Sequence, residues 1–267
     1  MTSLACCGGK VDEGSPLGSM IKVEDIECYQ AKPAENKNTD TLIVIATDVF
    51  GHTLPNSQLL ADKFSEACGA LCVAPDMFSG RPVRADVMDK IEALSEPGSG
   101  FLAKVVAFFT LLWHFPGFIM RNPPAKNLAR VEKVIQFYRK QGFKKIAVSG
   151  YCWGGRVATM LGQKKDLIDA FCANHPGGLK VPQDIDALVT PAAYVLTPDK
   201  DMQIKHPEAK ALEAALDKKP FPHVVKCYAN MHHGFAVRGG KQPDVLEKRK
   251  DAFDLAANFF RDVLKLT

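Results

Sequence analysis

The sequence predicts an α/β fold with a mainly parallel central sheet and helices on both faces. Short apolar runs alternate along the chain with longer segments in which apolar residues recur at helical spacing. A glycine-rich turn at residues 150–155 joins one of these runs to a helical segment. Repeated strand–helix–strand units form parallel sheets covered on both sides, and 267 residues are enough for one such domain. We expect this domain to span residues 19–267.

The apolar runs define the expected strands. They lie at residues 26–29, 42–46, 72–74, 146–149, 170–174, 192–196 and 223–228. Helices are expected where apolar residues follow a period near 3.6, as they do at Leu59, Leu60 and Phe64. The expected helices are 55–68, 128–140, 155–162, 207–216 and 245–264. Gly142 follows the second of them, where glycine commonly ends a helix.

The first 18 residues are polar and glycine-rich, and we expect them to form a flexible tail. They lack the basic start and apolar core of a secretory signal. Cys6 and Cys7 are most simply part of this loose tail, with acylation or metal binding as the alternatives. Five further cysteines fall in apolar stretches and are expected to be core thiols: Cys28, Cys68, Cys72, Cys172 and Cys227. This usage of cysteine favours a reducing, cytoplasmic location.

The charge of the chain is mildly positive. Its formal net charge is +4 and its pI is near 8.5. Apart from residues 248–250, no run of Lys and Arg exceeds two residues. The sequence therefore gives no support for nucleic-acid binding.

One segment, residues 101–120, is unusually apolar. Lys104, His114 and Pro116 interrupt it, so we do not expect it to span a membrane. The first interpretation is a buried helix and turn that fill the core. The second is a cover over the mouth of an active site, in which Trp113 borders a substrate pocket. The third is a contact with a membrane surface.

The most informative motif is Gly150-Tyr151-Cys152-Trp153-Gly154-Gly155, which directly follows an expected strand. It has the pattern Gly-x-Cys-x-Gly, a nucleophile elbow with cysteine in place of the usual serine. Glycines on both sides of the reactive residue leave room for a sharp turn from the strand into the next helix. The motif marks Cys152 as the candidate nucleophile, although most cysteines in such proteins are inert core residues.

Two further loops complete a catalytic order. Asp201 and His233 each follow an expected strand, so nucleophile, acid and histidine occur in the chain order of an α/β-hydrolase. In such a triad the histidine takes the proton of the thiol, and the aspartate orients and stabilises the histidine. Asp199 and His232 are the alternatives for these two roles. His175 also ends a strand and is expected to be a structural turn residue.

With these loops the sequence resembles the dienelactone hydrolase family, including its carboxymethylenebutenolidase-like members. The resemblance extends from about residue 22 to the C-terminus and rests on residues 48–51, 74–78, 150–155 and 233–239. It implies an α/β-hydrolase fold and the hydrolysis of a lactone or related ester. It also implies a triad of Cys152, His233 and Asp201 that forms a thioester acyl-enzyme.

The resemblance suggests roles for residues around the triad. The backbone N–H groups of Trp153 and Val49 are the expected donors to the oxyanion. Asp48 stands where bacterial members carry a glutamate that keeps the resting cysteine protonated. For the shorter aspartate, this gating role and a role in capping a helix or fixing its loop are both open. Arg81 and Arg238 are candidates for binding a substrate carboxylate.

Together these features predict a hydrolase of small carboxylic esters or lactones that uses neither a cofactor nor a metal. The expected oligomeric state is a monomer or weak dimer. One alternative is a broad carboxylesterase or thioesterase with an apolar acyl pocket. The other is a non-catalytic, redox-sensing protein in which Cys152 is oxidised rather than acylated.

Overall fold

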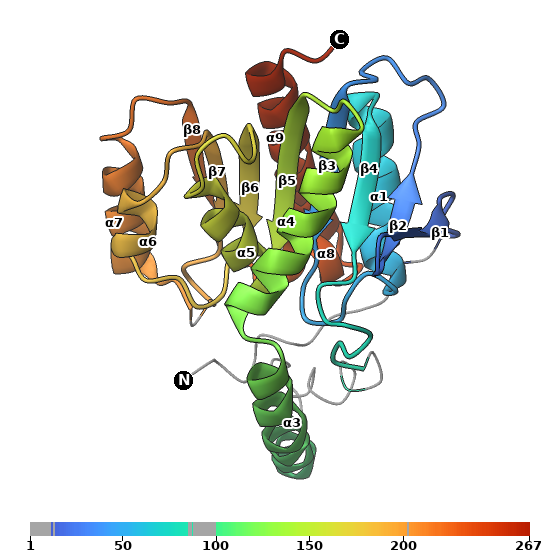
Figure 1. Ribbon diagram of the computed structural model, residues 1–267. Helices are drawn as coiled ribbons and strands as arrows, with labels where there is room; N and C mark the ends of the chain where they lie inside the picture. The colour runs from blue at the N-terminus through green and yellow to red at the C-terminus, as the bar shows by residue number, and fades with distance from the viewer. Residues whose placement is uncertain (1–11, 13, 85–86, 88–99, 202) are drawn as a thin grey trace.

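In the part of the chain that the structure describes, eight strands form one central sheet (Figure 1). The structure is a computed structural model, and it describes residues 12, 14–84, 87, 100–201 and 203–267. The strands are β1 (Ser19–Val23), β2 (Ile26–Ala31), β3 (Thr41–Ala46), β4 (Leu71–Pro75), β5 (Lys145–Tyr151), β6 (Ala170–Asn174), β7 (Ala192–Leu196) and β8 (His223–Cys227). Their order in the sheet is β1-β2-β4-β3-β5-β6-β7-β8. Pairing is antiparallel for β1–β2 and β2–β4 and parallel from β4 to β8, which confirms the expected mainly parallel sheet.

The helices alternate with the strands as the sequence predicts. They are α1 (Pro55–Cys68), α3 (Phe101–Arg121), α4 (Pro124–Lys140), α5 (Trp153–Gly162), α6 (Gln183–Asp186), α7 (His206–Leu216), α8 (Phe235–Arg238) and α9 (Pro243–Leu264). The strand β1 and the one-turn helices α6 and α8 were not predicted from the sequence. The helix α4 begins at Pro124, four residues before the predicted start, and proline suits the first turn of a helix.

Both faces of the sheet are covered. The side chains of β3 alternate: Leu42 and Val44 pack with the apolar faces of α4 and α5, whereas Ile43 and Ile45 pack with those of α1 and α9. Every residue of β3 is therefore buried, which explains why its sequence is a continuous apolar run rather than an alternating one. Figure 1 shows α4 and α5 in front of the sheet and α9 behind it.

The parallel strands end together at one side of the sheet, which we call the carboxyl edge. Loops that follow these strands carry the polar residues of the expected site. Asp48 follows β3, Cys152 follows β5, His175 follows β6, Asp201 follows β7 and His233 follows β8. Ligands of such sheets bind beyond the carboxyl ends of the strands, so the topology gathers these residues where a ligand would bind.

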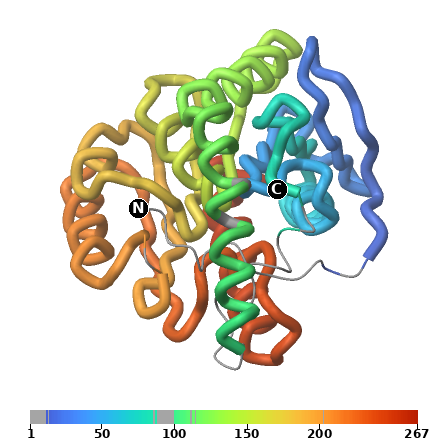
Figure 2. Tube along the Cα trace, turned by 90° about the horizontal axis from the view of Figure 1, so that it is seen from below, coloured from blue at the N-terminus to red at the C-terminus, as the bar shows by residue number. Residues whose placement is uncertain are grey.

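The apolar segment differs from its first interpretation. It forms one continuous helix, α3, which runs through Pro116 without a turn. Only 12% of the most apolar 18-residue stretch of α3 is buried, and Trp113 is 84% exposed. The helix therefore does not fill the core. By length and composition alone it is apolar enough to cross a membrane, but a single helix of this kind is weak evidence and not a clear span. Figures 1 and 2 show α3 crossing beneath the carboxyl edge.

The N-terminal segment is only partly described. Residues 1–11 and 13, which include Cys6 and Cys7, lie outside the described residues. Asp12 forms an ion pair with Arg249 of α9, and the Gly18 N–H donates a hydrogen bond to the Tyr29 hydroxyl. The part of the predicted tail that the structure describes is thus attached to the domain by several contacts.

Most of the expected core thiols are confirmed. Cys28, Cys68, Cys72 and Cys172 are buried, whereas Cys227 is exposed, so the prediction for Cys227 was wrong. Cys227 is the last residue of β8, which is the edge strand of the sheet and only partly covered along its length. An edge strand has one neighbour instead of two, and its side chains are less enclosed for that reason.

Candidate active site

The turn between β5 and α5 forces Cys152 into an unusual backbone conformation. Its φ is 54° and its ψ is −110°, a combination that costs a residue with a side chain roughly 1–3 kcal/mol. Gly150 and Gly154 make the turn possible. A Cβ on Gly150 would lie 2.2 Å from the Gly154 carbonyl oxygen, and one on Gly154 would lie 1.9 Å from the Ala46 carbonyl oxygen. The elbow expected from the motif is present, and it is pressed against the end of β3.

Backbone hydrogen bonds fix this turn to the loop after β6. The Cys152 N–H donates to the Asn174 carbonyl at 3.0 Å, and the Cys152 carbonyl accepts from the Gly177 N–H at 3.1 Å. Cys152 is 8% exposed, so its thiol is nearly enclosed but retains some access. The strained conformation is thus held from both sides by the surrounding structure.

Asp201 and His233 are hydrogen-bonded to each other. His233 Nδ1 lies 2.7 Å from Asp201 Oδ2, and both residues are at most 5% exposed. The carboxylate also accepts hydrogen bonds from the Gln203 backbone N–H at 2.8 Å and from the Thr197 hydroxyl at 3.3 Å. These contacts orient Asp201 toward the histidine ring and leave Nε2 as the ring nitrogen opposite the carboxylate.

The two alternatives for these roles lie elsewhere. Asp199 pairs with the His206 ring at 2.7 Å and accepts the Asn230 N–H at 2.9 Å. His232 is exposed, whereas its neighbour His233 is buried. The structure therefore brings Asp201 and His233 together and directs Asp199 toward α7.

His175 lies next to His233. Its ring centroid lies 5.0 Å from that of His233, and the residue is fully buried. Neither of its ring nitrogens has a hydrogen-bond partner within the described residues. Burial, together with the nearby charges of His233 and Arg238, holds the pKa of His175 well below its ordinary value. A neutral imidazole therefore packs against His233 and restricts the positions that the His233 ring can take.

The expected oxyanion donors lie on the two segments that meet at the elbow. Trp153 is the first residue of α5, and Val49 follows the end of β3, against which Gly154 packs. The Val49 carbonyl accepts the Val83 N–H at 2.8 Å, which fixes this peptide in place. Within the described residues, neither the Val49 nor the Trp153 backbone N–H donates to a protein acceptor. Both donors remain available for a ligand.

Asp48 and Arg238 form a buried ion pair. Arg238 Nε donates to Asp48 Oδ2 at 2.6 Å, and both side chains are 0% exposed. The other carboxylate oxygen accepts the Phe50 N–H at 3.0 Å, and the guanidinium lies 4.9 Å from the centre of the Phe50 ring. These contacts fix the loop that carries Val49, which is the loop-fixing role left open by the sequence. The pair was not predicted from the sequence, because it joins residues 190 positions apart.

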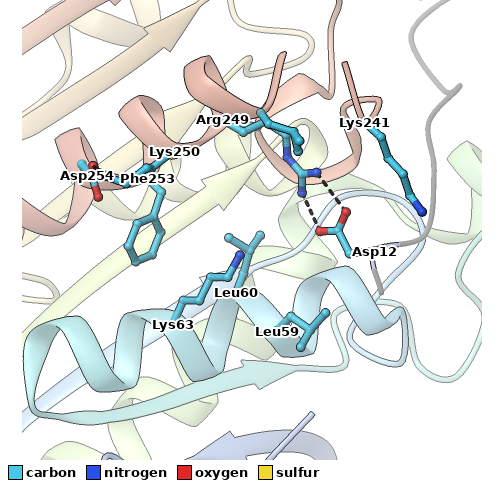
Figure 3. Close-up of a pocket in the computed structure, with 11 residues that line it drawn as sticks. Asp12, Leu59, Leu60, Lys63, Lys241, Arg249, Lys250, Phe253 and Asp254 are labelled. Carbon is cyan, nitrogen blue, oxygen red and sulfur yellow. Dashed lines mark hydrogen bonds and ion pairs between the residues drawn. The ribbon is translucent and has the colours of Figure 1, made fainter. Parts of the chain in front are cut away.

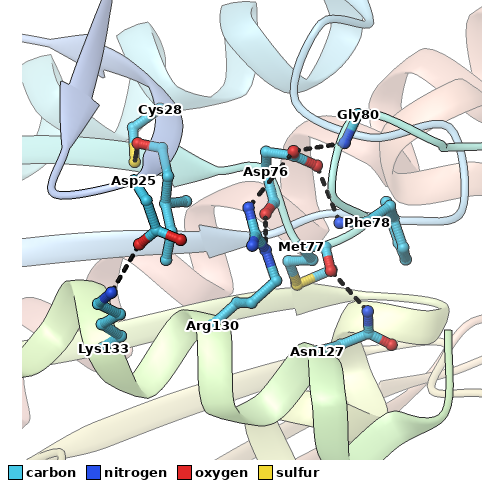
Figure 4. Close-up of polar contacts among 10 residues, drawn as sticks. Asp25, Cys28, Asp76, Met77, Phe78, Gly80, Asn127, Arg130 and Lys133 are labelled. Atoms are coloured by element: carbon cyan, nitrogen blue, oxygen red, sulfur yellow. Dashed lines mark hydrogen bonds and ion pairs between the residues drawn. The ribbon is translucent and has the colours of Figure 1, made fainter.

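Asn127 links the site to the loop after β4. Its side-chain oxygen accepts the Trp153 indole N–H at 2.8 Å. Its side-chain nitrogen donates to the Met77 carbonyl at 2.6 Å, as Figure 4 shows. In the same loop, Asp76 accepts the N–H groups of Phe78 and Gly80. Asn127 was also missed. The signal for it is an asparagine on the buried side of a helix that is otherwise apolar there.

Two of the candidate substrate-binding residues are exposed. Arg81 follows the loop after β4, and Trp113 lies on the outer side of α3. Trp113 is therefore not enclosed by the described residues, and its role at the border of a substrate pocket stays a prediction. The C-terminal turn of α3 does approach the site, because the centre of the Phe118 ring lies 5.5 Å from that of Trp153 and 5.2 Å from that of Phe78.

A separate pocket of about 590 Å³ lies between α1 and α9 (Figure 3). It contains none of the predicted triad residues. Its charged groups are largely paired with one another, with Arg249 on Asp12 and Lys250 on Asp254. The pocket therefore offers no catalytic arrangement. Among the residues described, no group of His, Cys, Asp and Glu side chains is suited to hold a metal ion.

Comparisons with known proteins place this architecture among hydrolases. A model of the dienelactone hydrolase family matches residues 26–264. Hydrolase tropI of Talaromyces stipitatus is 28% identical over 276 residues, 99% of this chain and 98% of that protein. The carboxymethylenebutenolidase homolog of Xenopus tropicalis is 25% identical over 257 residues, 92% of each protein.

Solved structures show the same fold. A putative dienelactone hydrolase from Klebsiella pneumoniae superposes with a TM-score of 0.64 at 18% identity, covering 89% of this chain and 93% of its own. The propionate-bound esterase Est2 of Thermogutta terrifontis gives a TM-score of 0.63 at 15% identity, covering 94% and 96%. The chain thus has the α/β-hydrolase fold.

Proposed function

The chain belongs to the dienelactone hydrolase family and is a hydrolase of ester bonds, and we propose that Cys152, His233 and Asp201 are its catalytic triad. The observation that carries the proposal is the buried 2.7 Å hydrogen bond between His233 and Asp201, at the edge where the elbow presents Cys152. The proposed substrates are small carboxylic esters or lactones, and the proposed intermediate is a thioester.

In the first half of the reaction, His233 Nε2 takes the thiol proton as Cys152 Sγ attacks the carbonyl carbon of the ester. Asp201 keeps the Nδ1 proton in place and stabilises the imidazolium that forms. The carbonyl oxygen becomes an oxyanion, which the N–H groups of Trp153 and Val49 stabilise. When the tetrahedral intermediate collapses, the C–O bond breaks, and His233 returns its proton to the departing alkoxide. The products of this half are an alcohol and the thioester.

In the second half, His233 takes a proton from water as the water oxygen attacks the thioester carbonyl. The same two N–H groups stabilise the second oxyanion. The C–S bond then breaks, the acid is released, and the proton returns from His233 to the thiolate. The cycle consumes one water and requires no oxidant, reductant or cofactor.

The charges around the site favour an uncharged substrate. Arg238, a candidate for binding a substrate carboxylate, is buried and paired with Asp48. Arg81, the other candidate, is exposed. The aromatic rings of Trp153, Phe118 and Phe78, by contrast, are in contact in series next to the elbow. We therefore propose that uncharged esters with an apolar acyl or alcohol group are turned over better than esters that carry a free carboxylate.

We also propose that the protein works in a reducing compartment such as the cytoplasm. All six cysteines that the structure describes have free thiols. Burial raises the pKa of Cys28, Cys68 and Cys172 to about 12, which makes these thiols unreactive. A triad that uses a thiol nucleophile needs conditions that keep Cys152 reduced.

The test is turnover of p-nitrophenyl acetate by Cys152→Ala and by the matched control Cys227→Ala, which removes an exposed thiol away from the elbow. We expect the first variant to lose turnover and the second to retain it, with unchanged thermal unfolding for both. Iodoacetamide followed by mass spectrometry should modify Cys152 before the buried thiols, and substrate should protect it.

His233→Asn separates a hydrolase from a redox sensor. A hydrolase loses ester turnover with this substitution, because no other group takes the proton. A sensor needs a reactive thiol but no base for acyl transfer, so its peroxide-dependent oxidation of Cys152 would continue. Wild-type turnover by Cys152→Ala, in a preparation free of other hydrolases, would contradict the proposed triad.

A further inference from the structure

Among the described residues, the exposed side of α3 departs furthest from ordinary burial. Thirteen large apolar side chains are exposed among the described residues, and nine of them belong to this one helix. They include Phe101 at 85%, Leu102 at 74%, Phe109 at 62% and Met120 at 83% exposure. Patches of this kind mark contact sites, because contiguous apolar surface exposed to water is unfavourable.

The exposed apolar residues share one face of α3. At 100° per residue, the positions from Phe101 to Met120 that expose large apolar side chains fall within an arc of about 160°. Leu112 and Phe109 lie near the middle of this arc, and the arc contains no charged residue. Ala107 and Phe118, which are the buried residues among those of the helix whose burial is described, lie on the opposite side. We call the exposed arc the outer face of α3.

Among the described residues of α3 and the first turn of α4, the charged side chains are all basic. Lys104 and Arg121 lie to either side of the arc, and Lys126 follows on α4. Residues 97–131 contain no Asp or Glu. A face with an apolar centre, aromatic side chains and basic flanks has the composition of helices that lie in the interface of an anionic membrane. The same charges disfavour a second copy of the helix as the partner, because two outer faces would bring basic flanks together.

The placement of α3 suits an orientation parallel to a surface. Figure 1 draws the helix below the carboxyl edge, and Figure 2, which views the molecule from below, shows it lengthwise across the middle of the domain. The C-terminal turn of α3 contacts Trp153 through Phe118, so this end of the helix is anchored beside the elbow. A surface that covered the outer face would therefore also face the carboxyl edge.

We propose that α3 docks the protein on a phospholipid bilayer with anionic headgroups, with the helix lying in the interface and the carboxyl edge facing the membrane. The inference goes beyond the proposed function, because it rests on the outer face and not on the triad. Burial of the outer face in the acyl region removes apolar side chains from water, and Lys104 and Arg121 remain at headgroup depth. An enzyme bound in this way receives esters that are dissolved in the lipid.

The test is co-sedimentation of the full-length protein with vesicles of phosphatidylcholine that contain about 30 mol% phosphatidylserine. Phe109→Glu/Leu112→Glu places two charges in the middle of the outer face, and we expect its partition coefficient to fall at least about a hundredfold. The matched control is Val189→Glu, an exposed apolar residue that precedes β7 at the opposite edge of the sheet, and it should bind as the wild type does. Circular dichroism and thermal unfolding establish that each variant is folded.

Two further measurements define the partner. Lys104→Ser/Arg121→Ser should weaken binding to these vesicles by roughly tenfold or more, with little effect on binding to pure phosphatidylcholine. In Trp153→Phe, Trp113 is the one remaining tryptophan, so its emission should shift to shorter wavelength when vesicles are added. Both results support contact of the outer face with lipid.

Three outcomes would overturn the proposal. The first is a wild-type protein that stays in the supernatant with anionic vesicles. The second is equal binding of the wild type to anionic and pure phosphatidylcholine vesicles, which would exclude the anionic headgroup as the partner. The third is a wild-type dimer in sedimentation velocity that Phe109→Glu/Leu112→Glu converts to a monomer without any vesicle binding, which would make the outer face a contact between copies. Loss of ester turnover in Cys152→Ala bears on the triad alone, because vesicle binding does not depend on Cys152.

Discussion

Two regions at the carboxyl edge have opposite patterns of burial. Next to the elbow, the charged side chains of Asp48 and Arg238 are 0% exposed. On α3, the apolar side chains of Phe101 and Trp113 are 85% and 84% exposed. The two regions are joined by the contact of Phe118 with Trp153. At this edge of the sheet, hydropathy would predict that the charged side chains are exposed and the apolar ones buried, and the structure shows the reverse.

The difference shows that partners, rather than hydropathy, decide burial in this part of the molecule. Asp48 is enclosed because the guanidinium of Arg238 and the Phe50 N–H occupy its oxygens. A buried charge is tolerated when it is paired and hydrogen-bonded in this way. The outer face of α3 has no protein partner in the described structure, and its exposure remains unfavourable until another surface covers it.

The largest effect is expected for the acid of the buried region. Asp201→Asn should lower kcat by about a thousandfold or more, because the amide no longer holds the His233 ring in the useful tautomer. The matched control is Asp199→Asn, two positions earlier, which should change kcat far less because Asp199 pairs with His206. The measurement is kcat for p-nitrophenyl acetate at saturating substrate. A larger loss for Asp199→Asn would show that the wrong aspartate has been assigned.

The next effect concerns the buried ion pair. Arg238→Met should lower the free energy of unfolding by about 3–5 kcal/mol, because it leaves the Asp48 carboxylate buried without its partner. Asp48→Asn/Arg238→Met should recover part of this loss, since no uncompensated charge remains. Urea unfolding followed by circular dichroism measures both values. A cost below about 1 kcal/mol for Arg238→Met would mean that the pair contributes no more to stability than an exposed ion pair does. The buried pairing would then not explain the difference between the two regions.

The same contrast explains what the sequence could predict. The strands around Cys152, Asp201 and His233 were predictable because glycine turns and apolar runs are local signals. The pair of Asp48 and Arg238 was not, because it depends on two loops that only the folded sheet brings together. The exposure of α3 was missed for a related reason. Apolar composition predicts burial without stating against what, and here the domain does not cover the helix.

His175 offers a smaller test of the buried region, through pH. Its pKa is depressed in the folded protein, so unfolded chains bind a proton more readily than folded ones below about pH 6.5. Its contribution to stability is therefore fully present above that pH and is lost as the pH falls. His175→Asn removes the titrating ring and keeps a residue that tolerates the positive φ of 37° at this position.

We expect the free energy of unfolding of His175→Asn to fall less steeply below pH 6.5 than that of the wild type, by at most about 1.4 kcal/mol per pH unit. Urea unfolding between pH 5 and pH 8, taken in roughly half-unit steps, measures both slopes. Above about pH 7.5 the ring is neutral in both states, so there the two curves should run parallel and provide the internal control. Parallel curves over the whole range would mean that His175 does not stay neutral when the protein is folded.

The smallest effect is expected on α3. Trp113→Ala removes one of the largest side chains in the protein, yet it should change the free energy of unfolding by no more than about 0.5 kcal/mol, because 84% of the residue already contacts water. Phe118→Ala, five positions later on the same helix, is the matched comparison. Phe118 is 2% exposed and its ring contacts those of Phe78 and Trp153, so its truncation should cost about 3–5 kcal/mol. Urea unfolding without lipid measures both. A cost of several kcal/mol for Trp113→Ala would mean that the outer face packs against the protein in solution, and the opposition between the two regions would then disappear.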